Sequence, residues 1–329
     1  MDFPGIVLDT SLFTQSLPPD SHATYDMLVL GGGPAAMSAA IYAARKMLKI
    51  AILTLNFGGQ LKETSSIENY LGFQSIHAND LVSRFDEQVK SFNFPIGMGV
   101  AIKEVIKEND LFSVLMEDGA RFSGRTIIFA TGESHRRLKI PGEEEFIGRG
   151  VAYCATCDAP LYRGKKVLVV GGGNSAFTTA LDLARGNAEI TLVNVAQGWQ
   201  ADASLREKVA GYEKAEFLNL HELMSIEGSE HVEYAILKNN RTGEERTVPV
   251  DGIFIEIGLL PNSHPVAKLV NLNDMGEVVV DCLCRTDVPG FFAAGDVTTV
   301  PHKQIIISAG EGAKAALTAY DYLVETAQI

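Results

Sequence analysis

Hydrophobic and polar residues follow two patterns along this chain. Compact apolar runs at 25–30, 49–54 and 167–170 are typical of strands that are buried on both faces of a parallel sheet. The first two runs flank a glycine-rich turn and a helical pattern over about 37–47, and residues 166–194 repeat this arrangement. Each region therefore predicts a strand–helix–strand unit, which implies a parallel sheet.

Alternating apolar and polar residues follow each of these units, at 94–131 and 231–257, and predict meanders of strands. The C-terminal part has an apolar strand that ends at Asp296 and a helical pattern over about 312–326. Because this part has no glycine fingerprint of its own, we expect it to return to the first domain. The predicted fold is α/β, with two Rossmann-like, three-layer ββα nucleotide-binding domains, the second inserted into the first.

The length of 329 residues is long for a single core and suggests two domains. Polar stretches at 133–137 and 258–262 are the candidate crossings between them. The prediction is therefore an N-terminal extension at 1–24, a first domain at 25–134 plus 261–329, and a second domain at 135–260.

The charge balance limits the classes of partner. With 28 basic and 41 acidic residues the net charge is −13, which argues against nucleic acid and anionic membranes because both require a basic surface. No apolar run reaches the length of a membrane span, and no secretory signal pattern is seen at the N-terminus. We expect a cytoplasmic enzyme.

A C-x-x-C pair, Cys154 to Cys157, is followed at once by Asp158 and lies just before the second strand–helix–strand unit. Two thiols at this spacing can cycle between dithiol and disulfide, so the pattern favours redox chemistry. The alternative, half of a zinc site, needs two more ligands. The remaining cysteines, Cys282 and Cys284, form a distant C-x-C without a nearby histidine, so we predict no metal site and two buried spare thiols.

Two glycine fingerprints each lie between an apolar strand and a helix, at Gly31-x-Gly33-x-x-Ala36 and Gly171-x-Gly173-x-x-Ala176. This pattern permits a tight turn, lets a pyrophosphate approach the backbone, and places the phosphates at a helix N-terminus. On pattern alone, either turn could hold NAD or FAD. A flavin accepts a hydride and also exchanges electrons with thiols, so it is the natural intermediary between a nicotinamide and a thiol pair.

Several motifs resemble those of one family over roughly residues 24–326. They are Gly31–Ala35, Gly58–Leu61, Ile67–Tyr70, Ala130–Gly132, Cys154–Asp158, Gly171–Ala176, and Ala293–Asp296 continuing to Lys303–Ile305. Together they resemble the low-molecular-weight thioredoxin reductases and the flavoprotein core of the alkyl hydroperoxide reductase flavin subunit. The resemblance implies a homodimer that passes electrons from NAD(P)H through FAD and the cysteine pair to a thioredoxin-like protein.

The resemblance also implies roles for individual residues. The FAD contacts would be Gly31, Gly33, Pro34, Ala35, Gly59, Gln60, Asn69, Asp296 and Gln304. The NAD(P)H contacts would be Gly171, Gly173, Asn174, Ser175, Ala176 and Asn194. Cys157 would be the sulfur next to the flavin, Cys154 would attack the partner disulfide, and Asp158 would be the acid–base group. A helix N-cap is an alternative role for Asp158.

One departure from the family pattern concerns the choice of nucleotide. Asn194 stands where an acid would bind the 2′-hydroxyl of NADH, and no arginine follows until Arg206 to bind the 2′-phosphate of NADPH. Asn194 can still hydrogen-bond a ribose hydroxyl, so we predict NADH over NADPH. Because the loop after Asn194 has few groups that could bind a nucleotide, two alternatives stay open. The protein could be a flavoprotein that uses a non-pyridine donor such as ferredoxin, or one that acts as a redox sensor.

Overall fold

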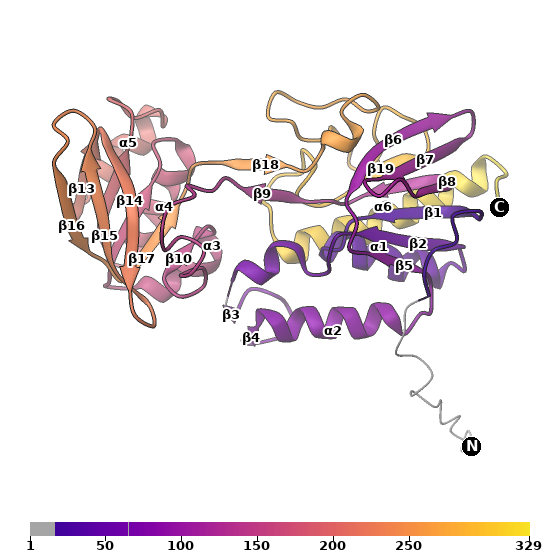
Figure 1. Cartoon of the computed structure of the whole chain (residues 1–329), viewed down its shortest axis with the longest axis horizontal. Helices are drawn as coiled ribbons and strands as arrows, with labels where there is room; N and C mark the ends of the chain where they lie inside the picture. Colours follow the sequence, from indigo (N-terminus) through magenta and orange to yellow (C-terminus); the bar gives the residue numbers. More distant parts are fainter. Residues whose placement is uncertain (1–16, 65) are drawn as a thin grey trace, which may run out of the picture. The chain divides into compact units, whose positions relative to one another are not determined.

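A computed structural model describes residues 17–64 and 66–329, so most of the predicted extension at 1–24 lies outside the described residues. The chain divides into two compact units (Figure 1). The first comprises the residues up to Lys62, Asn79–Ser134 and Pro261–Ile329. The second comprises Glu63–Ala78 and His135–Leu260. Residues 63–78 fall within the range predicted for the first domain, whereas their contacts group them with the second unit.

The first unit is built on a parallel sheet with the strand order β5-β2-β1-β8. The first half of β8 also pairs with the antiparallel meander β6-β7, and its second half pairs with β19. The elements of this unit are β1 (Thr24–Leu30), α1 (Pro34–Arg45), β2 (Ile50–Thr54), η2 (Gly59–Glu63), α2 (Ala78–Lys90), β5 (Ile96–Met98), β6 (Ile102–Glu108), β7 (Leu111–Met116), β8 (Arg121–Phe129), η4 (His264–Val266), β19 (Phe291–Ala293) and α6 (Ile305–Glu325).

The second half of strand β1, Met27–Leu30, is apolar without interruption and fully buried. Met27 and Val29 pack into the core that contains α1 and α6, whereas Leu28 and Leu30 pack into the core under the meander. A strand that is covered on both faces needs apolar residues at every position, so the alternation of a half-buried strand is absent. Helix α6 approaches α1 so closely that a Cβ on Gly312 would lie 2.0 Å from the carbonyl oxygen of Ala35.

The second unit repeats this plan with the all-parallel order β10-β17-β11-β12-β13. Its antiparallel sheet, β14-β15-β16, packs on Leu168 and Val170 of β11, while the helices pack on Val167 and Val169. The elements are β3 (Ser66–Ile67), β4 (Ile76–His77), β10 (Val151–Ala152), α3 (Ala155–Asp158), η3 (Ala159–Tyr162), β11 (Lys166–Val170), α4 (Asn174–Arg185), β12 (Glu189–Asn194), α5 (Ala203–Ala210), β13 (Ala215–Asn219), β14 (His221–Gly228), β15 (Val232–Asn239), β16 (Glu245–Pro249) and β17 (Gly252–Ile255).

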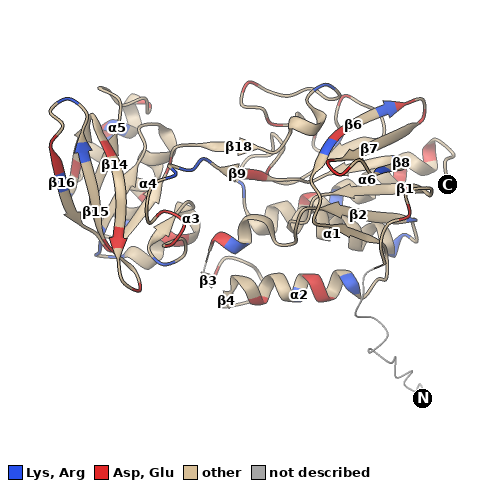
Figure 2. Ribbon diagram, in the orientation of Figure 1, with Lys and Arg blue, Asp and Glu red and all other residues tan. Residues whose placement is uncertain are grey.

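The two chain crossings, β9 (Glu133–His135) and β18 (Leu259–Pro261), pair with each other as a two-stranded ribbon. Acidic and basic positions are interspersed along both units (Figure 2). In residues 17–64 and 66–329, no helix is long and apolar enough to cross a membrane.

The predicted α/β fold with two Rossmann-like domains is confirmed, while several local expectations need correction. Helix α6 begins at Ile305 and not near residue 312. The residues between these two positions are already helical, and the helix packs closely against α1. Cys284 is buried as expected, but Cys282 is exposed and lies in a turn.

Candidate functional site

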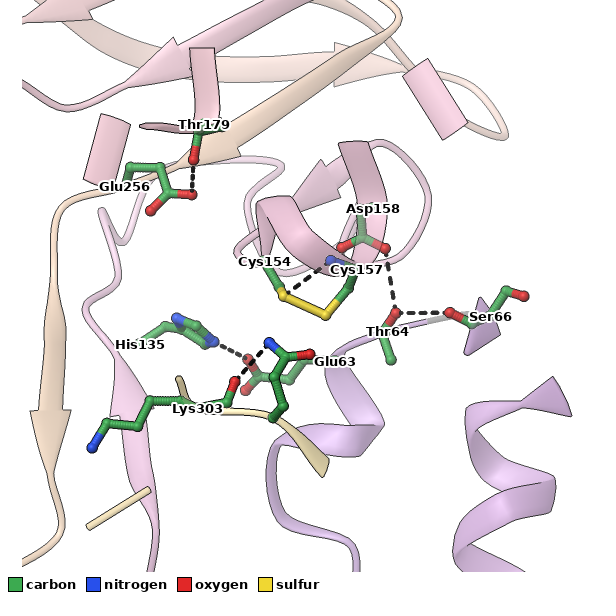
Figure 3. The surroundings of a disulfide bond; sticks show 11 residues. Glu63, Thr64, Ser66, His135, Cys154, Cys157, Asp158, Thr179, Glu256 and Lys303 are labelled. Carbon is green, nitrogen blue, oxygen red and sulfur yellow. Dashed lines mark hydrogen bonds and ion pairs between the residues drawn. A yellow bond between two sulfur atoms is a disulfide. The ribbon is translucent and has the colours of Figure 1, made fainter. Parts of the chain in front are cut away.

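The cysteine pair lies where β10 ends and the short helix α3 begins (Figure 3). Cys154 and Cys157 form a disulfide, with their Cα atoms 5.3 Å apart. Cys154 is the N-cap of α3, and its Sγ accepts a hydrogen bond from the backbone N–H of Cys157 at 3.3 Å. A hydrogen bond to a sulfur favours negative charge on it, so the turn is arranged to stabilise a Cys154 thiolate.

Asp158 ends α3 and is half-buried. Its Oδ1 accepts a hydrogen bond from the Thr64 hydroxyl at 3.4 Å (Figure 3). Burial raises the pKa of Asp158 to about 6, and the Thr64 hydroxyl opposes this rise. The carboxyl can therefore take up and release a proton near neutral pH. Asp158 also occupies the N-cap position of η3, as the alternative role predicts, but its side chain makes no capping hydrogen bond there.

A polar cluster supports the backbone on the N-terminal side of Cys154. The Tyr153 hydroxyl donates to Oε1 of Glu143 at 2.8 Å, and the Arg137 guanidinium lies 4.4 Å from the Tyr153 ring centroid. Arg137 also binds Oε1 of Glu63 at 2.5 Å. Burial, together with the charge of Arg137, lowers the pKa of the stacked His135 to about 4, so this imidazole is neutral at physiological pH. The cluster fixes Tyr153, and through it the position of Cys154.

The first glycine turn joins β1 to α1 and has the geometry of a phosphate-binding cradle. Gly31 has φ +126°, and a Cβ there would lie 2.1 Å from the carbonyl oxygen of Ala130. Gly33, in contrast, has open space where a Cβ would be, and as the N-cap it offers no side chain to the first amides of α1. An anion such as a pyrophosphate can therefore reach these N–H groups.

Two further predicted FAD contacts, Gly59 and Asp296, lie close to this first cradle. A Cβ on Gly59 would lie 3.8 Å from Gly33 Cα, and a Cβ on Gly295 would lie 2.9 Å from Ala35 Cβ. Asp296 follows that glycine and accepts a hydrogen bond from the Ser308 hydroxyl at 2.8 Å. Gln60 lies on η2, Gln304 is the N-cap of α6, Pro34 is the first residue of α1, and Asn69 lies in the segment that groups with the second unit.

Sequence reasoning missed Glu133, a buried carboxyl in the first unit. Its backbone oxygen accepts a hydrogen bond from Gln60 Nε2 at 2.7 Å. Burial, together with the charge of Asp296, raises the pKa of Glu133 to about 8, and Lys303 opposes the rise. Lys303 itself pairs with Glu277 at 3.0 Å. The sequence did contain a signal for Glu133, because an acidic residue directly after an apolar strand that ends in Ala-Thr-Gly is a candidate for a buried carboxyl.

The second glycine turn, between β11 and α4, has the same backbone geometry as the first. Gly171 has φ +148°, and a Cβ on it would lie 2.3 Å from the carbonyl oxygen of Glu256. Gly173 is the N-cap of α4, again with open space at its Cβ position and without a capping side chain. Ala176 is fully buried against the sheet, as the fingerprint requires. This turn, too, is shaped to receive an anion.

The polar side chains around this second cradle already have partners. Asn174 exchanges two hydrogen bonds with Asp202, and the Ser175 hydroxyl donates to Glu256. Asn194 is buried; its Nδ2 donates to the Gly198 carbonyl at 2.7 Å, and its Oδ1 accepts from the Ala196 N–H at 3.1 Å. Asn194 therefore shapes its own loop, and its contact with a ribose stays a prediction.

The sequence matches the pyridine nucleotide-disulphide oxidoreductase family over residues 25–318, and the chain belongs to that family. It is a flavoprotein disulfide oxidoreductase by class, and membership implies FAD and a pyridine nucleotide as cofactors. Both glycine turns fit this implication, since each leaves room for a pyrophosphate beside free helical amides.

Individual relatives support the two parts of the resemblance. A thioredoxin reductase structure from Streptococcus pyogenes is similar with a TM-score of 0.88 and 35% identity, over 92% of this chain and 99% of that one. The F subunit of alkyl hydroperoxide reductase in Staphylococcus aureus is 40% identical, over 97% of this chain and 62% of the relative. Its counterpart in Pseudomonas putida is 42% identical, over 92% of this chain and 59% of the relative. The chain thus spans about three-fifths of the length of these curated relatives.

Proposed function

We propose that this protein is a thioredoxin reductase-like enzyme that passes electrons from NAD(P)H, with NADH favoured, to the disulfide of a thioredoxin-like protein. The observation that carries the proposal is the Cys154–Cys157 disulfide with Asp158 beside it, on a chain with two dinucleotide cradles. FAD, when bound, accepts a hydride from the nicotinamide and delivers two electrons to a disulfide. The names of the similar thioredoxin reductase and alkyl hydroperoxide reductase proteins are consistent with this reaction.

In the proposed cycle, two electrons first reduce the Cys154–Cys157 disulfide to a dithiol. The Cys154 thiolate then attacks one sulfur of the partner disulfide, so that the partner S–S bond breaks and a mixed disulfide forms. Cys157 attacks Cys154, restores the internal disulfide and releases the partner as a dithiol. The N–H of Cys157 supports this order, because its hydrogen bond to Cys154 Sγ stabilises the attacking thiolate.

Asp158 is the proposed proton carrier for the cysteine pair. The partner dithiol leaves with two protons, so a group beside the sulfurs must take up and release protons during turnover. Asp158 directly follows Cys157, and its pKa of about 6 lies close to operating pH. Its neighbour Thr64 is a positioning residue, since its hydroxyl holds the Asp158 carboxylate.

The choice of NADH follows from charge around the second cradle. Residues 194–201 contain no lysine or arginine, so a 2′-phosphate would be left without compensation. A specific observation also favours a second candidate, a flavin-dependent disulfide reductase or redox sensor with a non-pyridine donor such as ferredoxin. The side chains of Asn174 and Ser175 are hydrogen-bonded to carboxylates, which weakens the second cradle as an anion site.

Anaerobic titration of the purified flavoprotein separates these functions. We expect NADH to bleach the flavin absorbance rapidly and NADPH to do so slowly, whereas bleaching by neither nucleotide would favour the second candidate. With a thioredoxin-like substrate, Cys154→Ser and Cys157→Ser should abolish disulfide reduction. Cys282→Ser, which removes an exposed thiol outside the pair, is the matched control and should retain it. Light scattering tests the accompanying expectation of a homodimer.

A further inference from the structure

The second cradle differs from the first in its charged surroundings. In the second unit, β17 leads directly into Glu256, whose carboxylate accepts hydrogen bonds from two hydroxyls of α4. One comes from Ser175, and the other comes from Thr179 at 2.7 Å. These two residues lie one helical turn apart on the same face of α4, so the Glu256 carboxylate lies along that face near the N-terminus of the helix.

Ser175 links this carboxylate to the expected pyrophosphate site. The fingerprint directs the phosphates to the amides that follow Gly173, and Ser175 is among the residues expected to contact them. Stretches 171–179, 194–201 and 252–258 contain no lysine or arginine. Within the described part of the chain no ion pair involves Glu256. Burial raises the pKa of its carboxyl, while the hydrogen bonds from the Ser175 and Thr179 hydroxyls favour the charged form.

We propose that Glu256 is a specificity-determining residue of the second cradle, which selects against ligands that carry pyrophosphate charge and keeps the affinity for pyridine dinucleotides low. The inference rests on the proposed function in that the ligand is taken to be a pyridine dinucleotide. The carboxylate and the pyrophosphate compete for the same hydroxyl and repel each other in a partly desolvated site. The NADH preference has a separate origin, because the 2′-position of the ribose is recognised at the end of β12 and not at Glu256.

The test is the affinity of the oxidised, FAD-saturated protein for NAD⁺ and NADP⁺, measured by isothermal titration calorimetry. Glu256→Gln keeps acceptors for Ser175 and Thr179 but removes the charge. We expect its dissociation constants for both nucleotides to fall by roughly tenfold, with their ratio unchanged. Glu245→Gln, an exposed position on β16, makes the same charge change away from the cradle and should leave both constants unaltered.

Glu256→Ala provides a second test, because it removes the charge without adding an amide and should also tighten binding. An unchanged or weaker affinity in both variants overturns the inference, and would instead indicate that Glu256 binds ribose hydroxyls. Absence of binding by the wild type and by both variants overturns it as well. The proposed function can fail separately. If Glu256→Gln binds the nucleotides more tightly but NADH does not bleach the flavin, electron transfer from NADH is refuted while the proposed role of Glu256 is supported.

Discussion

Asp158→Asn is expected to make the second unit more stable at neutral pH. In the folded protein, burial raises the pKa of Asp158 from 3.8 to about 6, a rise of about two units that corresponds to roughly 3 kcal/mol. Because the folded pKa is the higher one, the protonated carboxyl stabilises the fold at low pH, and this stability is lost as pH rises from about 4 to about 6. Asparagine stays neutral and avoids the loss.

The second unit contains its own optical probe for this measurement. Trp199 is the single tryptophan of the chain, and its ring packs edge-on against Phe177 and Phe217. Urea unfolding followed by Trp199 fluorescence therefore reports on the unit that contains Asp158. The unfolding free energy of Asp158→Asn minus that of the wild type should grow by about 2 kcal/mol between pH 4 and pH 8.

Glu245→Gln is the control, since its exposed side chain meets water in both states and its effect should not vary with pH. A difference between Asp158→Asn and wild type that stays constant from pH 4 to pH 8 would refute the reasoning. So would a difference that shrinks as pH rises, because burial would then favour the charged form. The stabilised variant should nonetheless turn over slowly, as the proton carrier has been removed.

Two further predictions concern Thr64 and the first cradle. Thr64→Val removes the hydroxyl that holds Asp158, so the corresponding inflection in the pH–rate profile should move up by about one unit, while Thr64→Ser restores it. Identical profiles for the two variants would exclude a positioning role. Gly33→Ala should fold, because its Cβ meets open space. It should nevertheless lose flavin on gel filtration, which would lower the ratio of absorbance at 450 nm to that at 280 nm. Gly31→Ala should fail to fold, because its Cβ would clash with the Ala130 carbonyl. Full flavin retention by Gly33→Ala would contradict the assignment of the cradle.

The glycine turns were predictable because their requirement is local. Gly31 and Gly171 must adopt positive φ between a strand and a helix, and each fingerprint lies within six residues of sequence. The uninterrupted apolar run Met27–Leu30 in β1 similarly indicates a strand that is covered on both faces. Strand, turn and helix could thus be located without tertiary information, although the helix ends shifted where packing extended them, as at Ile305.

Long-range neighbours could not be predicted in the same way. Thr64 and Asp158 are 94 residues apart, and Ser175 and Glu256 are 81 apart. These contacts depend on the order of the strands in the sheets and on the packing of segment 63–78 with the second unit. No local sequence pattern encodes either feature. Asn194 is a different case, because its contact with the Ala196 N–H is a short-range turn of the kind asparagine favours. This local contact could have been predicted from the sequence, while the ribose contact of Asn194 stays a prediction.

The return of the C-terminal segment affects how the chain folds during synthesis. The first unit needs β19 beside β8 and α6 against α1, and these elements are synthesised after the whole of the second unit. All segments of the second unit, in contrast, have been made once Leu260 has emerged. The nascent protein must therefore keep the apolar edge of β8 unpaired while the second unit forms completely. A pause or a premature stop after residue 261 would leave a folded second unit in the same chain as an incomplete first unit.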